Sequence, residues 1–369
     1  MRRGDAGDAR GELRVGLIGA GGIARAHAAG YGQQPGVRVV ALCGTGAERG
    51  RRLAAEVGAA YHTDYRELLA RPDVQAVSVC SPPSLHAEHA VAAARSGRHV
   101  LLEKPMCPTL AECDAVIAAC RAQGVRLMVG QTQRFIASDI AARELVQRGE
   151  IGRPVLITDV SVHPDAGARG WVWDRGIAGG GIFMSSAVHR ADWLRWVTGA
   201  EFEEVFARVG TFGRPVETED AGVVSIRFTD GALGSLVQIA PPGPTHAARR
   251  ERVVYGTEGT IVVQMYTALE CYSRRTAFVQ RFERDDTWAR ETGEFVAAVR
   301  ERRDPLVTGQ DGRAALAFVL AVYRSAALGR PVRLAELEDV ADLDDPDEPS
   351  VAPRAEPTSG EDPRPRTAL

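Results

Sequence analysis

The chain has 369 residues, 45% hydrophobic and 25% charged, a composition typical of a globular protein with about two domains. Its formal net charge is −3, and the acidic segment 336–369 leaves the remainder mildly positive without a dense basic stripe, which argues against a nucleic-acid partner. No apolar run approaches the roughly 18 residues of a membrane helix, and the residues that follow Met1 are polar, unlike an export signal. We therefore expect a cytoplasmic protein without a membrane partner.

Short apolar strands alternate with helices over the first third of the chain. The expected strands occupy residues 13–18, 37–42, 74–80, 99–102 and 125–129. Such alternation is typical of a parallel sheet with right-handed crossovers. We predict an α/β protein whose N-terminal Rossmann domain, a doubly wound parallel sheet, covers residues 13–130 and follows a disordered start at residues 1–12.

A glycine-rich turn follows the first predicted strand and opens a helix. Gly19, Gly21 and Ala24 form the pattern G-x-G-x-x-A, in which the glycines permit a tight turn and a close approach of the backbone to a pyrophosphate. The helix N-terminus then favours the negative charge of the phosphates. We expect Gly19, Gly21, Gly22 and Ile23 to bind a dinucleotide.

The end of the second strand determines how the adenosine ribose would be held. A ribose-binding acid is missing there, because the chain has Gly44 where a carboxylate is usual, followed by Thr45 and, one helical turn later, Arg49. An absent carboxylate with a nearby arginine tolerates a 2′-phosphate. We expect Thr45 and Arg49 to bind the cofactor and NADP to be preferred over NAD. Glu48 could instead replace the ribose acid, which leaves NAD open.

The second half of the chain contains mostly strand patterns. They lie at residues 155–162, 205–209, 222–228, 233–239, 252–256 and 260–264, and Asp230-Gly231 is typical of a hairpin turn. Helices near 185–197 and 287–302 could cover one face of this sheet. We predict a substrate and oligomerisation α+β domain over residues 131–334 with an open-faced, mostly antiparallel sheet that forms a homodimer or homotetramer. The acidic, proline-rich segment 335–369 is predicted to be disordered.

The six cysteines form no C-x-x-C pair and no Cys/His cluster with zinc spacing. Two of them, Cys43 and Cys80, end apolar strand patterns, where cysteine acts as a small hydrophobic residue. We expect no metal site.

One residue type is nearly absent from the chain. Lys104 is the only lysine among 45 basic residues, and it lies in Glu103-Lys104-Pro105 directly after an apolar strand. A guanidinium stays protonated, whereas an ammonium group can give up its proton when its surroundings shift its pKa. A single lysine retained at a strand end therefore indicates a chemical role for Lys104.

A second candidate group follows three glycines at positions 179–181. Ser185 and His189 are four residues apart and share a helix face, and Asp192 lies three residues beyond His189. A histidine held by such neighbours can serve as an acid or a base near neutral pH. From this pattern alone, His189 could equally be a structural helix residue.

Together these motifs and their order resemble the Gfo/Idh/MocA family of oxidoreductases over residues 13–334. The resemblance implies hydride exchange between a nicotinamide and a polyol or keto-sugar substrate, such as a sugar or cyclitol. It implies that Lys104 contacts the reacting oxygen and that His189 is the acid/base. The further site residues implied are, for the cofactor, Ser81, Pro82, His86 and Glu103, and, for the substrate, Arg134, Trp171, Trp173 and Ser185.

The chain departs from the family pattern at Ser185, because many members have an aspartate four residues before the histidine. A serine cannot carry the charge that stabilises an imidazolium. Lys104 and His189 could suffice, with Ser185 or Asp192 fixing the tautomer of His189; the substrate could differ; or activity could be weak. The alternatives are a non-catalytic nucleotide-binding sensor or assembly protein on the same fold, and a dehydrogenase of another two-domain family.

Overall fold

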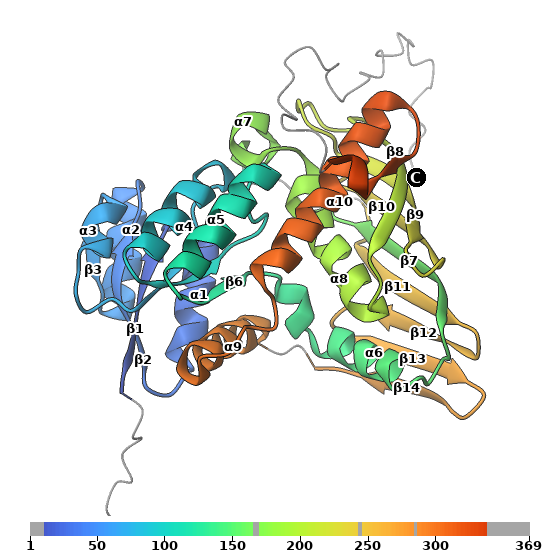
Figure 1. The fold of residues 1–369 in the computed structure, drawn as a ribbon, viewed down its shortest axis with the longest axis horizontal. Coiled ribbons are helices and arrows are strands. Elements are labelled where there is room, and N and C mark those ends of the chain that lie inside the picture. Colours follow the sequence, from blue (N-terminus) through green and yellow to red (C-terminus); the bar gives the residue numbers. More distant parts are fainter. Residues whose placement is uncertain (1–10, 165–169, 243–245, 284–285, 338–369) are drawn as a thin grey trace, which may run out of the picture.

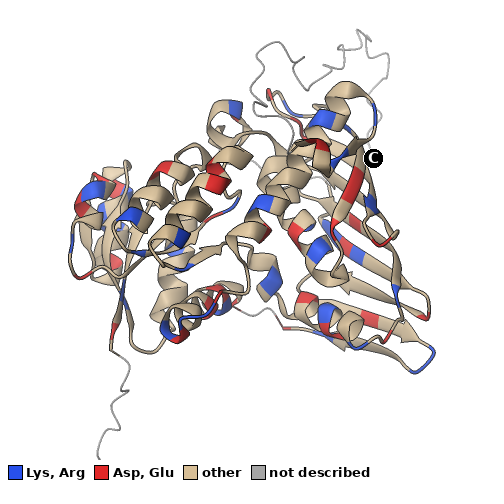
Figure 2. Cartoon of the chain, viewed as in Figure 1, with Lys and Arg blue, Asp and Glu red and all other residues tan. Residues whose placement is uncertain are grey.

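The computed structural model describes residues 11–164, 170–242, 246–283 and 286–337, arranged as two sheets with helices packed around and between them (Figure 1). The predicted disordered segments lie outside these residues, apart from positions 11–12 and 335–337. No helix in the described part of the chain is long and apolar enough to cross a membrane. Acidic and basic residues are interspersed along both halves of the molecule (Figure 2).

The N-terminal half forms a parallel six-stranded sheet with the order β3-β2-β1-β4-β5-β6, which confirms the predicted Rossmann fold. Its strands are β1 (Leu13–Ile18), β2 (Val37–Cys43), β3 (Ala60–His62), β4 (Ala76–Val79), β5 (His99–Leu102) and β6 (Leu127–Val129). Its helices are α1 (Gly22–Gly32), α2 (Ala47–Val57), α3 (Tyr65–Leu69), α4 (His86–Arg95) and α5 (Leu110–Ala122). The strand order reverses between β1 and β4, and ligands bind in the crevice at such a point.

The second half forms a nine-stranded sheet with the order β14-β13-β12-β11-β7-β10-β9-β8-β15. The described strands are β7 (Pro154–Val162), β8 (Phe202–Gly210), β9 (Ala221–Phe228), β10 (Leu233–Ile239), β11 (Arg249–Gly256), β12 (Gly259–Gln264), β13 (Ala268–Ser273), β14 (Ala277–Arg281) and β15 (Val332–Arg333). The sheet is mostly antiparallel, as predicted, although β7 and β10 pair in parallel. Gly231 has a φ of 85° in the predicted hairpin between β9 and β10.

The helices of the second half divide their contacts between the two sheets. They are α6 (Ala137–Gln147), α7 (Arg175–Ala178), α8 (Val188–Thr198), α9 (Thr287–Glu301) and α10 (Gly309–Leu328). The long helix α10 packs on β8 and α8. The helix predicted near residues 287–302 is present as α9, but the expectation that it covers the large sheet was wrong, because it packs on α1 of the Rossmann domain (Figure 1). A Cβ atom at Gly30 of α1 would lie 2.8 Å from the Trp288 carbonyl oxygen, so only glycine permits this close helix contact.

Among the described residues, the helices pack on one face of the large sheet and leave its other face uncovered. Side chains alternate between buried and partly exposed along β7, β9 and β10. Leu233, Leu156 and Tyr255 occupy neighbouring positions on three adjacent strands, and all three are exposed, as are Tyr272 and Val279 further along the sheet. An apolar row of this kind on a sheet face is typical of an interaction surface.

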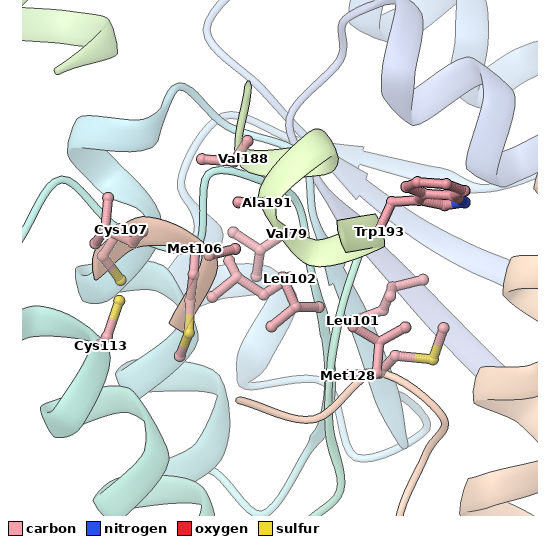
Figure 3. Packing of buried hydrophobic residues seen from close by; sticks show 14 of the residues in the cluster. Val79, Leu101, Leu102, Met106, Cys107, Cys113, Met128, Val188, Ala191 and Trp193 are labelled. Carbon is pink, nitrogen blue, oxygen red and sulfur yellow. The ribbon is translucent and has the colours of Figure 1, made fainter. Parts of the chain in front are cut away.

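The hydrophobic core is continuous between the two halves. Figure 3 shows members of this buried cluster from both halves, among them Leu101 and Leu102 of β5 and Val188 and Ala191 of α8. Helix α10 packs on α5 and β6 of the Rossmann domain and also on α8, so it holds α8 beside that domain. It therefore places the lysine and histidine motifs, 85 residues apart in the chain, at one location.

Candidate active site

A cavity of about 830 Å³ opens at the carboxyl ends of the Rossmann strands. Most of the residues predicted to bind the cofactor line it, namely Gly19, Gly21, Gly22, Ile23, Thr45, Arg49, Ser81, Pro82, Glu103 and Lys104. Ser185, from the second half of the chain, lines it as well. The cavity therefore extends from the glycine-rich turn to the lysine motif.

The glycine-rich turn fits a dinucleotide. Gly19 has a φ of 114°, and a Cβ atom there would lie 2.5 Å from the Cys80 carbonyl oxygen, so no other residue could replace it without strain. A Cβ atom on Gly21 would meet no atom within 4 Å, which leaves the backbone open to the cavity. Helix α1 begins at Gly22 without a side-chain cap. Its first N–H groups can therefore bind a pyrophosphate.

The adenosine end of the cavity has an arginine and no carboxylate at the usual position. A Cβ atom on Gly44 would lie 2.8 Å from the Ala20 Cβ, so the position cannot carry an acidic side chain without movement of the turn. Arg49 lines the cavity, whereas Glu48 does not. The Asp64 carboxylate lines it too, but it caps α3 by accepting from the Arg66 N–H at 2.8 Å.

Several lining residues were missed by the sequence interpretation. Thr63, Asp64, Tyr65 and Arg66 line the cavity from the segment after β3, and His89 lines it from α4. Strand β3 has only three residues and no apolar run, so its own residues did not indicate a strand. The repeated alternation of strand and helix before it is the one signal that could have suggested a further strand end here.

His86 does not line the cavity, contrary to the prediction that it binds the cofactor. Its Nδ1 lies 2.9 Å from the Pro105 carbonyl oxygen and its Nε2 lies 2.8 Å from that of Ser81. Burial lowers the pKa of His86. The side chain links the end of β4 to the lysine motif, so we assign it a structural role.

Lys104 lies where β5 ends and reaches the second half of the molecule. Its Nζ donates to the Ser185 carbonyl oxygen at 2.7 Å, and the bond between Lys104 and Pro105 is cis. The Glu103 carboxylate accepts from the Lys104 backbone N–H at 3.2 Å and lies 3.1 Å from His27 Nε2. Burial alone would raise the pKa of Glu103, but the hydrogen bond from His27 and the charges of His27 and Lys104 lower it.

His189 is buried at the start of α8, and its tautomer follows from one contact. Its Nδ1 lies 2.7 Å from Gln131 Oε1, an acceptor, so Nδ1 carries the proton and Nε2 is left as an acceptor. Burial, followed by the charge of Lys104, lowers the pKa of His189 well below its usual value. The imidazole is therefore neutral, and His189 is not among the residues that line the cavity, which ends at Ser185 one helical turn earlier.

The sequence suggested that Ser185 or Asp192 could fix the tautomer of His189, but neither does so in the structure. Ser185 lies in a π-helical turn, Phe183–Ala187, and its hydroxyl donates to the Ile182 carbonyl oxygen at 3.5 Å. The Asp192 carboxylate instead accepts two hydrogen bonds from Arg134, at 2.6 and 2.7 Å. The tautomer is set by Gln131.

Arg134 and Trp173, both predicted to contact substrate, do not line the cavity. The buried guanidinium of Arg134 pairs with Asp192 and with Asp311 at 3.0 Å. The indole of Trp173 is 6% exposed, and Arg214 lies over its ring. We assign both a structural role, whereas the half-exposed Trp171 does line the cavity.

A second buried ion-pair cluster supports α8 from the side of the large sheet. Arg252 of β11 donates to Asp139 at 2.7 Å and to Asp159 at 2.9 Å, and it also bonds Gln133. Its guanidinium lies 4.4 Å from the centre of the Trp193 ring on α8. Buried charges persist only when paired in this way, so the cluster fixes the position of the helix that carries His189.

These features define the class of protein, an oxidoreductase with a Rossmann domain for a nicotinamide cofactor. A family model described as an oxidoreductase family with an NAD-binding Rossmann fold matches residues 13–131, and a GFO/IDH/MocA C-terminal domain model matches residues 140–262. The chain belongs to the Gfo/Idh/MocA oxidoreductase family, which confirms the resemblance read from its motifs.

Similar proteins cover nearly the whole chain. It is 34% identical over 330 residues to the 1,5-anhydro-D-fructose reductase of Ensifer adhaerens, covering 87% of this chain and 98% of that protein. It is 30% identical over 344 residues to the myo-inositol 2-dehydrogenase of Thermotoga maritima, covering 88% and 99%. The structure of GenD2 from gentamicin A biosynthesis in complex with NAD has a TM-score of 0.80 at 26% identity, covering 90% and 99%.

Proposed function

We propose that this oxidoreductase transfers a hydride between its nicotinamide cofactor and a hydroxyl or keto group of a sugar, cyclitol or related polyol. The observation that carries the proposal is the position of Lys104 in the cavity, where its Nζ donates to the carbonyl oxygen of Ser185, four residues before His189. The names of the relatives, a reductase of an anhydro sugar and a dehydrogenase of an inositol, support the substrate class.

Lys104 and His189 have different roles in the proposed reaction. When bound, the nicotinamide takes up or supplies the hydride. In oxidation, His189 Nε2 accepts the hydroxyl proton while Lys104 donates a hydrogen bond to the same oxygen. In reduction, the Lys104 ammonium polarises the carbonyl, and a proton returns to the alkoxide oxygen from the His189 imidazolium. General acid–base assistance of this kind contributes about 10²- to 10⁴-fold.

We propose that NADP is preferred over NAD. The closed position at Gly44 and the presence of Arg49 in the cavity lining support this preference, because a 2′-phosphate favours a cation and the usual ribose-binding position cannot carry a carboxylate. Titration of the protein with NADPH and with NADH measures the preference directly. Tighter binding of NADH would contradict it.

We also propose that the uncovered face of the large sheet joins copies of this chain into a dimer or tetramer. The support is the row of exposed apolar side chains at Leu233, Leu156 and Tyr255. Replacing Leu156 and Leu233 by glutamate should lower the mass measured by light scattering. An unchanged mass would contradict this arrangement.

The experiment that tests the activity is turnover of a panel of sugars and cyclitols, followed by the absorbance of the reduced nicotinamide. A second candidate, a non-catalytic nucleotide sensor, is favoured by one observation, the serine at position 185 where a carboxylate is common. Cofactor binding without turnover of any substrate in either direction would support the sensor. Turnover that is lost in Lys104→Arg would support the dehydrogenase.

A further inference from the structure

Three buried titratable side chains meet next to Lys104, on the side of the Rossmann helix α1. His27 comes from α1, Glu103 precedes Lys104 at the end of β5, and Glu291 comes from α9, far along the chain. One nitrogen or oxygen atom from each lies within 4.8 Å of the others. The close contact between α1 and α9 at Gly30 brings these groups together.

His27 is shared unequally between the two carboxyl groups. Its Nε2 lies 3.1 Å from Glu103 Oε1 but 3.9 Å from Glu291 Oε2. The other ring nitrogen, Nδ1, lies 3.7 Å from the Cys80 sulfur. A single N–H group serves one acceptor well, so the hydrogen bond of His27 goes to Glu103.

Glu291 has a buried carboxyl group without a hydrogen-bond donor. Within the described residues, neither of its oxygens has a hydrogen-bond partner, and the side chain is fully buried. A buried carboxylate without donors is strongly disfavoured, and the group keeps its proton instead. Burial and the nearby charge of Glu103 raise the pKa of Glu291 well above its usual value, although Lys104 opposes this shift.

The titratable groups around Glu291 come from three elements. They are His27 and Tyr31 from α1, Cys80 after β4, and Glu103 and Lys104 after β5. The Tyr31 hydroxyl bonds Ser78 at 2.8 Å, so it is already engaged. Ionisation of Glu291 would place a second negative charge beside Glu103.

We propose that Glu291 is a positioning residue for Lys104: by staying protonated, it leaves the hydrogen bond of His27 to Glu103. Glu103 in turn accepts from the Lys104 backbone N–H at 3.2 Å, so its position affects the strand end that carries the lysine. When Glu291 ionises at alkaline pH, it competes for His27 and repels Glu103, and the placement of Lys104 is loosened. The effect on turnover depends on the role proposed for Lys104.

The test compares wild type with Glu291→Gln, which has nearly the same shape and cannot ionise. Glu294→Gln is a matched control on the same helix, because Glu294 pairs with Arg303 near the surface. At neutral pH, Glu291→Gln should turn over substrate at close to the wild-type rate. The pH at which kcat falls on the alkaline side should be about one pH unit higher in Glu291→Gln than in wild type. This shift corresponds to the scale of one charge-assisted hydrogen bond. The control should follow wild type.

An infrared measurement on the same variants needs no substrate. Wild type should show the carbonyl band of a protonated carboxyl group, and the band should be missing from Glu291→Gln but present in Glu294→Gln. An unchanged band, or an alkaline limb that stays in place or moves to lower pH, would overturn the proposal. Because the band is independent of turnover, failure of the proposed activity alone would leave this measurement decisive.

Discussion

Replacing Lys104 by arginine keeps the positive charge and removes the compact, titratable ammonium group. In the structure, Lys104 Nζ reaches the Ser185 carbonyl oxygen at 2.7 Å, in a cavity whose walls are a strand end and a helical turn. The longer, planar guanidinium cannot place one compact N–H donor in the same position beside the reacting oxygen. The groups that hold the pyrophosphate, at Gly19 and Gly21, are untouched.

We expect kcat/KM of Lys104→Arg to fall by about 10²- to 10⁴-fold, the usual contribution of a positioned acid or base. This corresponds to about 2.7–5.4 kcal/mol of transition-state stabilisation. Cofactor affinity, measured by titration, should stay at the wild-type value. The reverse exchange at an exposed site, Arg148→Lys, is a control for the chemistry of the substitution, because Arg148 lies at the C-terminal end of α6 and pairs there with the exposed Glu144. Turnover of Lys104→Arg close to that of wild type would refute the role given to this residue.

Three further predictions concern the buried ion pair, the cofactor and the histidine. Asp192→Asn should lower the free energy of unfolding, measured by denaturant titration, by about 3 kcal/mol. This is the lower end of the range for breaking a buried ion pair, because Asp311 also contacts Arg134. The kcat of the folded enzyme should stay unchanged. Arg49→Ala should weaken NADPH binding by roughly tenfold, the worth of one charge-assisted hydrogen bond, and leave NADH binding unchanged in a titration. Folding lowers the pKa of His189, so its contribution to stability is present above its usual pKa of 6.5 and is lost as pH falls. Urea unfolding should therefore show that the free energy of unfolding falls by up to ~1.4 kcal/mol per pH unit on acidification. The free energy of unfolding of His189→Gln should fall less over the same pH range.

The parts of the site that depend on backbone geometry were predictable from the sequence. Gly19 and Gly21 indicate a glycine-rich turn, in which position 19 requires glycine, and the strand–turn–helix order supports this interpretation. Lys104 could be singled out because it is the only lysine in the chain. The hydrophobic periodicity predicted the buried strands of both sheets, but it missed the strands β3, β13, β14 and β15, which are short or lie toward the sheet edges.

The partners of buried polar groups were not predictable in the same way. Asp192 lies three residues from His189 and could reach it by helix geometry, yet it pairs with Arg134, from a segment 58 residues earlier. His189 is held instead by Gln131. Sequence spacing describes neighbours within one helix, but these bonds form between elements that meet only when the chain folds, and a charge pairs with the opposite charge that tertiary packing brings nearest.

Helix α9 belongs to the second half of the chain in sequence but to the N-terminal half of the molecule in space. It follows most strands of the large sheet in the sequence, yet it packs on α1 and contacts that helix closely at Gly30. A fragment that stops at residue 130 would therefore lose the cover of Tyr31 and His27, which are fully buried in the whole chain. The nucleotide-binding half is thus completed by a helix from the C-terminal part of the polypeptide, and the cover of its first helix depends on residues more than 150 positions beyond the predicted domain boundary.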